Sequence, residues 1–250
     1  MPKISFLIAT KNRGDMIKDT LDSLIKQDIS EWEAIIVDDH GSDNTKELVA
    51  EYQEKRFRYY TLNKSHGMGV NCARNFGAMM AKSEIIAILD SDDIVYPHRA
   101  RVTVETFEND ASIDVFYSSF DFWVVSTGKV YERNNPPVYD FDIEIMKKMN
   151  YIPHCTLAVK KKVLLENPYN TYFRLAEDYE LTSRLACASK KFKFSPERLM
   201  KYRLGEQNVS NVGRDELVEK YDRLVKMLRG WLPFDENLVN QIKEIEDLKK

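Results

Sequence analysis

The first 110 residues alternate short apolar runs with segments whose apolar residues recur at helical spacing. Each of four such runs is long enough for one strand, and a predicted helix follows each of them. The runs cover residues 4–9, 34–37, 57–62 and 85–89, and the helical patterns cover 16–25, 48–52, 70–82 and 97–108. Strand–helix repeats join through right-handed crossovers, and nearly continuous apolar strands fit a sheet that is covered on both faces. The sequence therefore predicts an α/β fold with a mainly parallel sheet flanked by helices.

After residue 110 the predicted elements are shorter and have an aromatic bias. We expect two paired strands at 113–118 and 122–126. The remaining predicted elements are a loop at 134–137, helices at 140–149 and 178–190, and strands at 157–159, 191–195 and 199–203. We expect this half to continue the sheet, so that one domain spans residues 1–210.

The last 40 residues carry one apolar helical stripe. Its members step by four and three: Leu217, Tyr221, Leu224, Leu228 and Trp231. The other faces mix cationic and anionic side chains, whereas a membrane-surface helix has a more uniformly basic polar face. We therefore expect residues 211–250 to form a helical extension docked on its own domain, in preference to a dimer contact or a membrane helix.

Composition and charge exclude several classes of partner. The chain has 37 Lys and Arg against 40 Asp and Glu, and this balance leaves no electrostatic footprint for nucleic acid. Its three cysteines, Cys72, Cys155 and Cys187, show no C-x-x-C spacing and predict free thiols in a reducing compartment. No apolar stretch is long enough to span a bilayer. We expect a soluble cytoplasmic protein without a transmembrane segment, and peripheral membrane association stays open.

Three carboxylates follow the fourth apolar run, at Asp90, Asp92 and Asp93. In a parallel sheet they lie at the carboxyl edge, where open α/β sheets bind ligands. Crowded carboxylates raise one another's pKa unless a cation lies among them, and oxygen ligands suit Mg²⁺ or Mn²⁺. Residues two apart in an extended segment face the same way, so Asp90 and Asp92 can share a metal and a diphosphate, or one can bind a ribose hydroxyl. Asp93 then points away and caps or orients.

Two further polar clusters follow strand-like runs. Residues 10–13 (TKNR) come after the first run, and Asp38 and Asp39 come after the second. Either cluster alone is weakly informative, because Asp and Asn favour turns for local reasons, and the second cluster fits a plain turn and helix cap about as well as a functional site. Together with the cluster at Asp90 they lie at one sheet edge, and this coincidence favours a nucleotide site.

Four segments in this order resemble the family 2 inverting glycosyltransferases of the GT-A fold: 8–13 (IATKNR), 37–42 (VDDHGS), 73–77 (ARNFG) and 89–93 (LDSDD). The resemblance extends through residues 177–186 and covers about residues 1–210. It implies a Rossmann-like GT-A domain, with a nucleotide-sugar-binding half at 1–110 and an acceptor-side half at 111–210. It also implies sugar transfer with inversion from a nucleotide-sugar donor, usually UDP-linked, to a glycan, lipid-linked or protein-linked acceptor, as in polysaccharide biosynthesis.

The resemblance assigns roles to single residues. Thr10 and Asp39 match residues that hold the nucleoside, with Asp39 reading the base, and Arg74 matches a residue near the base and diphosphate. Asp92 is the better candidate for the Mn²⁺ or Mg²⁺ ligand, and Asp90 for the ribose or sugar, although both are expected near the metal. The full predicted nucleotide-sugar-binding set is Thr10, Asn12, Arg13, Asp39, Arg74, Asp90, Ser91 and Asp92.

Asp178 matches the general base of the family. Inverting transfer needs one base opposite the leaving group, because a divalent cation stabilises the leaving diphosphate in place of a general acid. Partial desolvation would bring the pKa of Asp178 closer to neutral. The residues alone favour a helix N-cap role for Asp178, the resemblance favours the base, and Glu177 remains the rival base.

The chain departs from the family pattern at two positions, and two alternative functions stay open. The family often has a histidine after a Tyr-Arg pair, where this chain has Gly205, with Glu206 or Asn208 as substitutes. His40 interrupts the usual Asp-Asp-Gly-Ser run. The alternative functions are an Asp-dependent phosphohydrolase, which usually carries its Asp-x-Asp after the first strand, and a sugar-nucleotide-binding module without transfer activity.

Overall fold

The computed structural model describes residues 1–132, 139–205 and 215–247. Its strands are β1 (Ile4–Thr10), β2 (Trp32–Asp38), β3 (Phe57–Thr61), β4 (Ile85–Ile88), β5 (Ile94–Val95), β6 (Val115–Val124), β7 (Lys129–Glu132), β8 (Ala158–Lys160) and β9 (Phe192–Leu204). Its helices are α1 (Gly14–Ile25), α2 (Thr45–Glu51), α3 (Val70–Met80), α4 (Arg99–Asn109), α5 (Ile143–Lys148), α6 (Lys161–Glu166), α7 (Glu177–Cys187), α8 (Asp215–Leu228) and α9 (Glu236–Asp247).

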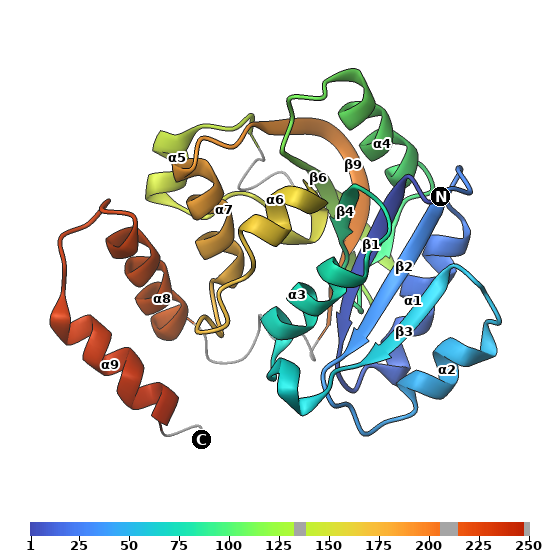
Figure 1. Cartoon of the computed structure of the whole chain (residues 1–250), viewed down its shortest axis with the longest axis horizontal. Helices are drawn as coiled ribbons and strands as arrows, with labels where there is room; N and C mark the ends of the chain where they lie inside the picture. The colour runs from blue at the N-terminus through green and yellow to red at the C-terminus, as the bar shows by residue number, and fades with distance from the viewer. Residues whose placement is uncertain (133–138, 206–214, 248–250) are drawn as a thin grey trace.

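The described strands form one curled sheet in the order β3-β2-β1-β4-β8-β6-β9-β5, with β7 paired to β6 (Figure 1). The first four strands of this order are parallel, as the strand–helix alternation predicts. Beyond them, β8 runs antiparallel to both β4 and β6, while β6 and β9 are parallel. The predicted α/β fold with a mainly parallel sheet is confirmed.

Helices cover both faces of the sheet because neighbouring strand residues point to opposite sides. In β1, Leu7 belongs to the hydrophobic cluster that includes α3, α6, α7 and α8. The next residue, Ile8, belongs to the cluster that includes α1, α2 and α4. The sheet is thus buried on both faces, and its carboxyl edge remains the place where polar loops can gather.

The second half differs from the prediction in its strands. The expected pair 113–118 and 122–126 is wrong, because β6 is one continuous strand of 10 residues. Likewise, the separate strands 191–195 and 199–203 are one strand, β9, of 13 residues. The parallel pairing of β6 with β9 shifts register on either side of Ser119, so the irregularity that looked like two strand ends is absorbed as a bulge. The loop expected at 134–137 lies outside the described residues.

The C-terminal residues form two helices, and α8 lies against α7 (Figure 1). Tyr221 of the predicted stripe is buried in the same cluster as α7, and so is Val225, which the predicted stripe does not include. The helix ends at Leu228, before Trp231, whose ring packs 6.4 Å from that of Tyr179. The three cysteines are free thiols. Among the described residues, none of the helices has both the length and the apolar character needed to span a membrane.

Candidate active site

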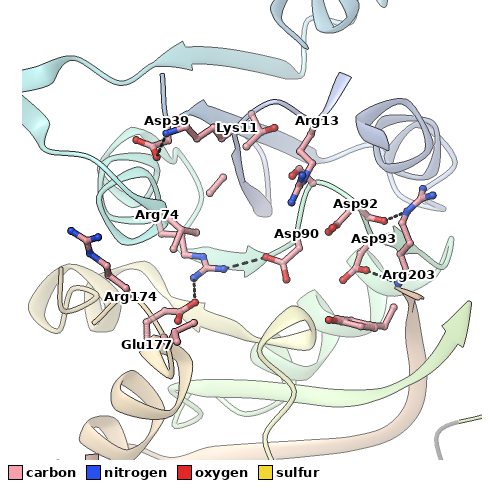
Figure 2. A pocket seen from close by; sticks show the side chains of 16 residues that line it. Lys11, Arg13, Asp39, Arg74, Asp90, Asp92, Asp93, Arg174, Glu177 and Arg203 are labelled. Atoms are coloured by element: carbon pink, nitrogen blue, oxygen red, sulfur yellow. Dashed lines mark hydrogen bonds and ion pairs between the residues drawn. The ribbon is translucent and has the colours of Figure 1, made fainter. Parts of the chain in front are cut away.

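Two adjoining cavities open at the carboxyl edge of the sheet. The first, of about 420 Å³, lies at the ends of β1, β2 and β4 (Figure 2). The second, of about 600 Å³, lies between β6, the segment 150–155 and the start of α7. The two cavities share lining residues, namely Arg74, Asp90, Leu175, Glu177 and Tyr202. This arrangement can hold two ligands that meet at Arg74, Asp90 and Glu177.

The first cavity gathers most of the predicted nucleotide-binding set. The predicted residues in its lining are Thr10, Arg13, Asp39, Arg74, Asp90, Ser91 and Asp92. They come from the last residue of β1, from the loops after β1, β2 and β4, and from α3, as expected for ligands at a carboxyl edge. Asn12 and Asp178 are not in this lining.

Thr10 and Asp39 form one end of the first cavity. The carboxylate of Asp39 accepts the Gly69 N–H at 2.9 Å, lies 3.5 Å from Lys11 Nζ and 3.3 Å from His40 Nδ1. The hydroxyl of Thr10 is buried and has no hydrogen-bond partner among the described residues. A buried hydroxyl without a partner is costly, so it is suited to bind a ligand in the cavity.

The neighbouring loop residues have structural roles. Asp38 accepts the Gly41 N–H at 2.8 Å and the Tyr59 hydroxyl at 2.6 Å. A Cβ on Gly41 would lie 2.7 Å from Asp38 Oδ1, so a larger residue here would displace the Asp38 carboxylate. Asn12 accepts the Ser42 N–H at 2.7 Å and thereby joins the loops after β1 and β2, which explains why it does not line the cavity.

The carboxyl groups of the acidic cluster after β4 have different contacts and different roles. Asp93 is buried but also lines the first cavity, so the prediction that it points away is wrong. Its Oδ1 accepts the backbone N–H of Arg203 at 2.8 Å, which fits the predicted orienting role. Arg203 also donates from Nε to the carbonyl oxygen of Asp92 at 2.6 Å. Burial and the nearby Asp90 carboxylate raise the pKa of Asp92, whereas Arg13 lowers it. Burial, Asp90 and Asp92 raise the pKa of Asp93 well above its usual value.

The donor atoms of Asp90 and Asp92 fit a hard divalent cation held jointly with a phosphate ligand. No group of three or more His, Cys, Asp and Glu side chains is placed to hold a metal within the described ranges 1–132, 139–205 and 215–247. Mg²⁺ commonly takes only one or two carboxylates, with phosphate oxygens and water completing its shell. A cation here would also relieve the crowding that raises the pKa of Asp92. Of the proposed histidine substitutes, Glu206 and Asn208 lie outside the described residues.

Arg74 connects the acidic cluster to the start of α7. Its guanidinium lies 3.2 Å from Asp90 and 3.0 Å from Glu177, and both contacts are drawn in Figure 2. The side chain is buried, and its guanidinium carbon lies 5.4 Å from the centre of the Tyr169 ring. Burial raises the pKa of Glu177, and the Arg74 contact opposes that shift. Glu177 is therefore committed to an ion pair.

Asp178 faces the second cavity. Its Oδ2 accepts the Asn150 side-chain amide at 2.9 Å, and its Oδ1 accepts the Tyr179 backbone N–H at 2.8 Å. Burial raises the pKa of this carboxyl, while these two hydrogen bonds lower it. The alternative role as helix N-cap is wrong, because Ala176 occupies that position with a left-handed φ of 52°.

The sequence did not identify several lining residues. Lys11 and Arg203 add positive charge to the first cavity, and Asn150 and Asp222 add polar groups to the second. Lys11 stands inside the motif 8–13, so its position was a usable signal. Asn150 and Asp222 reach the cavity only through the packing of α5 and α8, which no local pattern reports. His154 also lines the second cavity, where it contacts the Tyr169 hydroxyl at 2.8 Å and burial lowers its pKa well below the usual value.

Comparison with protein families and relatives gives one consistent result. The family model described as Glycosyl transferase family 2 matches residues 5–166. An uncharacterised glycosyltransferase of Methanocaldococcus jannaschii is 28% identical over 227 residues, covering 88% of this chain and 78% of the relative. A UDP-Glc:alpha-D-GlcNAc-diphosphoundecaprenol beta-1,3-glucosyltransferase of Escherichia coli is 25% identical over 227 residues, covering 88% of this chain and 85% of the relative.

Two solved structures share the fold. Residues 1–349 of S. aureus TarS in complex with UDP-GlcNAc align with a TM-score of 0.71 at 20% identity, covering 96% of this chain and 70% of that one. The mannosyltransferase PcManGT of Pyrobaculum calidifontis, in complex with GDP-Man and Mn²⁺, aligns with a TM-score of 0.66 at 15% identity. That match covers 92% of this chain and 64% of the mannosyltransferase. At these identities the likeness shows the fold, which is of the GT-A type.

Proposed function

The chain belongs to glycosyl transferase family 2, whose enzymes transfer sugars from nucleotide-sugar donors with inversion, and we propose that its own donor is UDP-linked. The family match supports glycosyl transfer over the phosphohydrolase and over the binding module without activity. In this proposal residues 1–110 form the donor half, 111–210 the acceptor-side half and 211–250 a helical extension. A cytoplasmic location stays a prediction.

The nucleoside is assigned to the end of the first cavity at Thr10 and Asp39. The Asp39 carboxylate is an acceptor for a base N–H, and the unpartnered Thr10 hydroxyl can bind the ribose or base. Uracil is favoured because UDP-Glc is the donor of the E. coli relative and the TarS structure contains UDP-GlcNAc.

The diphosphate is assigned to the middle of the first cavity. Lys11, Arg13 and Arg203 line that cavity and bring positive charge to it. Asp92, with Asp90, would hold a divalent cation against the phosphate oxygens. When bound, such a cation neutralises the charge that develops on the leaving diphosphate.

Asp178 is assigned as the general base. An acceptor hydroxyl in the second cavity attacks the anomeric carbon, the bond from that carbon to the diphosphate oxygen breaks, and the hydroxyl proton passes to Asp178. Glu177 is the weaker candidate, because its carboxylate is held by Arg74 at 3.0 Å. Asp178 instead accepts hydrogen bonds from an amide and a backbone N–H, and burial raises its pKa toward the range where a base works.

One observation carries the proposal: the cavity that Asp178 faces meets the first cavity at Asp90, Arg74 and Glu177. A donor and an acceptor bound in the two cavities would therefore present their reacting atoms to each other. The acceptor in this proposal is a hydroxyl of a glycan, lipid-linked or protein-linked molecule.

A thermal-shift screen tests the donor assignment. The full chain is melted with UDP, UDP-Glc, UDP-GlcNAc, GDP and GDP-Man, each with and without Mn²⁺. We expect UDP and at least one UDP-sugar to raise Tm, with a larger rise when Mn²⁺ is present. A lack of response to every nucleotide contradicts the donor site, and a larger response to GDP contradicts the choice of uridine.

A further inference from the structure

The C-terminal helix α8 contributes Asp222 to the wall of the second cavity. Asp222 lines the same space as Asp178 and Asn150, although it comes from beyond the segment that the family model matches. Burial is the main cause that raises the pKa of Asp178, and the negative charge of Asp222 raises it further. The acceptor side of the site is therefore built partly by the extension.

Several contacts fix α8 in this position (Figure 1). Tyr221, which precedes Asp222 in the chain, is buried, and the centre of its ring lies 5.9 Å from that of the Phe173 ring. Arg229 contacts the buried carboxylate of Glu180 on α7 at 2.9 Å. Lys226 Nζ donates to the carbonyl oxygen of Lys148 at 2.8 Å. Because α8 is held at both its apolar and its charged faces, Asp222 is presented to the cavity in a fixed place.

The second cavity is acidic. Its described lining contains four carboxyl groups, on Asp90, Glu177, Asp178 and Asp222. The one guanidinium in that described lining belongs to Arg74, which already contacts Asp90 and Glu177. An anionic group on a ligand would therefore meet repulsion here, whereas hydroxyl groups would meet acceptors.

The rest of this cavity has the mixed character that suits a sugar ring. Aromatic side chains supply apolar faces to its described lining: Phe120, Phe122, Tyr151 and Tyr202. On the polar side, Asn150 Oδ1 is buried without a hydrogen-bond partner among the described residues. Flat apolar faces with a few convergent polar groups bind the C–H faces and the hydroxyls of a pyranose at once.

We propose that Asp222 binds a hydroxyl of the acceptor, and that the second cavity accepts an uncharged pyranose and rejects a sugar with an anionic group beside the reacting hydroxyl. This proposal rests on the proposed function, because that function makes the second cavity the acceptor side. Asp222 is then a specificity-determining residue supplied by the extension.

Binding of small glycosides to the full chain tests the proposal without requiring turnover. Saturation-transfer NMR is recorded with the methyl β-glycosides of glucose, galactose and N-acetylglucosamine, and with methyl β-D-glucuronide. We expect at least one neutral glycoside to bind and the glucuronide to bind about tenfold more weakly. Asp222→Asn should lower the affinity for the neutral glycoside by about tenfold, as expected when a hydrogen bond to a charged group is lost. It should also reduce the ratio between the affinities for the neutral glycoside and for the glucuronide.

Glu236→Gln is the matched control, since it removes one carboxylate from an exposed position on α9 and Glu236 does not line the cavity. It should leave the affinities for the neutral glycoside and for the glucuronide unchanged.

UDP thermal shifts on the same samples separate the acceptor proposal from the proposed donor site. If UDP binds while no neutral glycoside does, or if the glucuronide binds as well as the neutral sugars, the acceptor proposal is overturned and the donor site stands. Unchanged glycoside binding in Asp222→Asn overturns the role of Asp222. Glycoside binding without any UDP response overturns the donor site instead.

Discussion

Arg74 Nη1 donates to Glu177 Oε1 at 3.0 Å across a sequence separation of 103 residues. This bond joins α3, which packs beside the nucleotide-binding loops, to the first turn of α7, which carries Asp178. The other nitrogen of the same guanidinium contacts Asp90 at 3.2 Å. One buried cation therefore fixes the distance between the acidic cluster and the proposed base.

Replacing Arg74 should destabilise the fold as well as the site. Arg74→Ala removes the buried counter-charge of Glu177 and Asp90, whose side chains are 18% and 33% exposed, so we expect a loss of about 2–3 kcal/mol, less than for a fully buried pair. Urea unfolding of the two proteins measures this difference. Arg101→Ala is the control, because Arg101 forms exposed pairs with Asp28 and Glu105, and its free energy of unfolding should change by less than about 1 kcal/mol. Equal effects of the two substitutions would contradict the bridging role of Arg74.

The kinetics of two variants should distinguish the proposed base, Asp178, from its neighbour, Glu177. Asp178→Asn keeps the shape of the side chain but removes the proton acceptor, so we expect transfer from the UDP-sugar to fall by about 10²–10⁴-fold. Its affinity for UDP, measured by calorimetry, should stay within about twofold because Asp178 does not line the first cavity. Glu177→Gln should lower the rate less than Asp178→Asn does. The reverse order of rates would move the base to Glu177.

The part of the site that the sequence predicted is the part that follows from sheet topology. Residues directly after parallel strands must gather at one edge, so Asp39, Asp90 and Asp92 could be placed together before their contacts were known. Asn12 has the right type and position, yet its amide binds a neighbouring loop, because side-chain direction in a turn is not set by strand order.

The acceptor side follows no such rule. Asp178, Asn150 and Asp222 belong to three segments whose mutual placement depends on how α5 and α8 pack against α7, and no periodicity connects them. The fusion of the predicted strand pairs into β6 and β9 has a related cause. Register shifts around Ser119 let β6 and β9 continue through residues that resemble strand ends. Whether a strand continues there depends on its pairing with the partner strand, which the local sequence does not show.

Stability should depend on pH through the buried carboxyls. Burial raises the pKa of Asp178 in the folded chain, so the folded state holds the proton more tightly than the unfolded state. Its contribution is fully favourable below the unfolded pKa, declines as pH rises through the folded pKa, and remains unfavourable at neutral pH. Asp178→Asn should therefore raise the free energy of unfolding and Tm at pH 7, and should have little effect near pH 3, which lies below the pKa of about 3.9 of an unfolded Asp.

Asp110 provides a control of opposite sign. Hydrogen bonds from Ser112 and the charge of Lys191 lower the pKa of this exposed carboxyl to about 2. Its stabilising contribution is therefore present above the unfolded pKa and is lost as pH falls toward the folded value. Asp110→Asn should lower Tm at pH 7 and lose that effect in acid. A pH-independent shift for Asp178→Asn would show that its stability effect does not come from ionisation.

Metal dependence should be located in the acidic cluster after β4. Asp92→Ala removes one of the two proposed metal ligands, Asp90 and Asp92, so the extra rise in Tm that Mn²⁺ adds to UDP should disappear. The rise produced by UDP alone should remain, because Thr10, Asp39 and Arg13 are intact. EDTA should reduce the wild-type response to that of Asp92→Ala and leave the variant unchanged. Asp43→Ala is the control, since Asp43 binds Gly14 and Thr45 in the loop before α2 and does not line the cavity. An Mn²⁺ response that survives in Asp92→Ala would place the metal elsewhere.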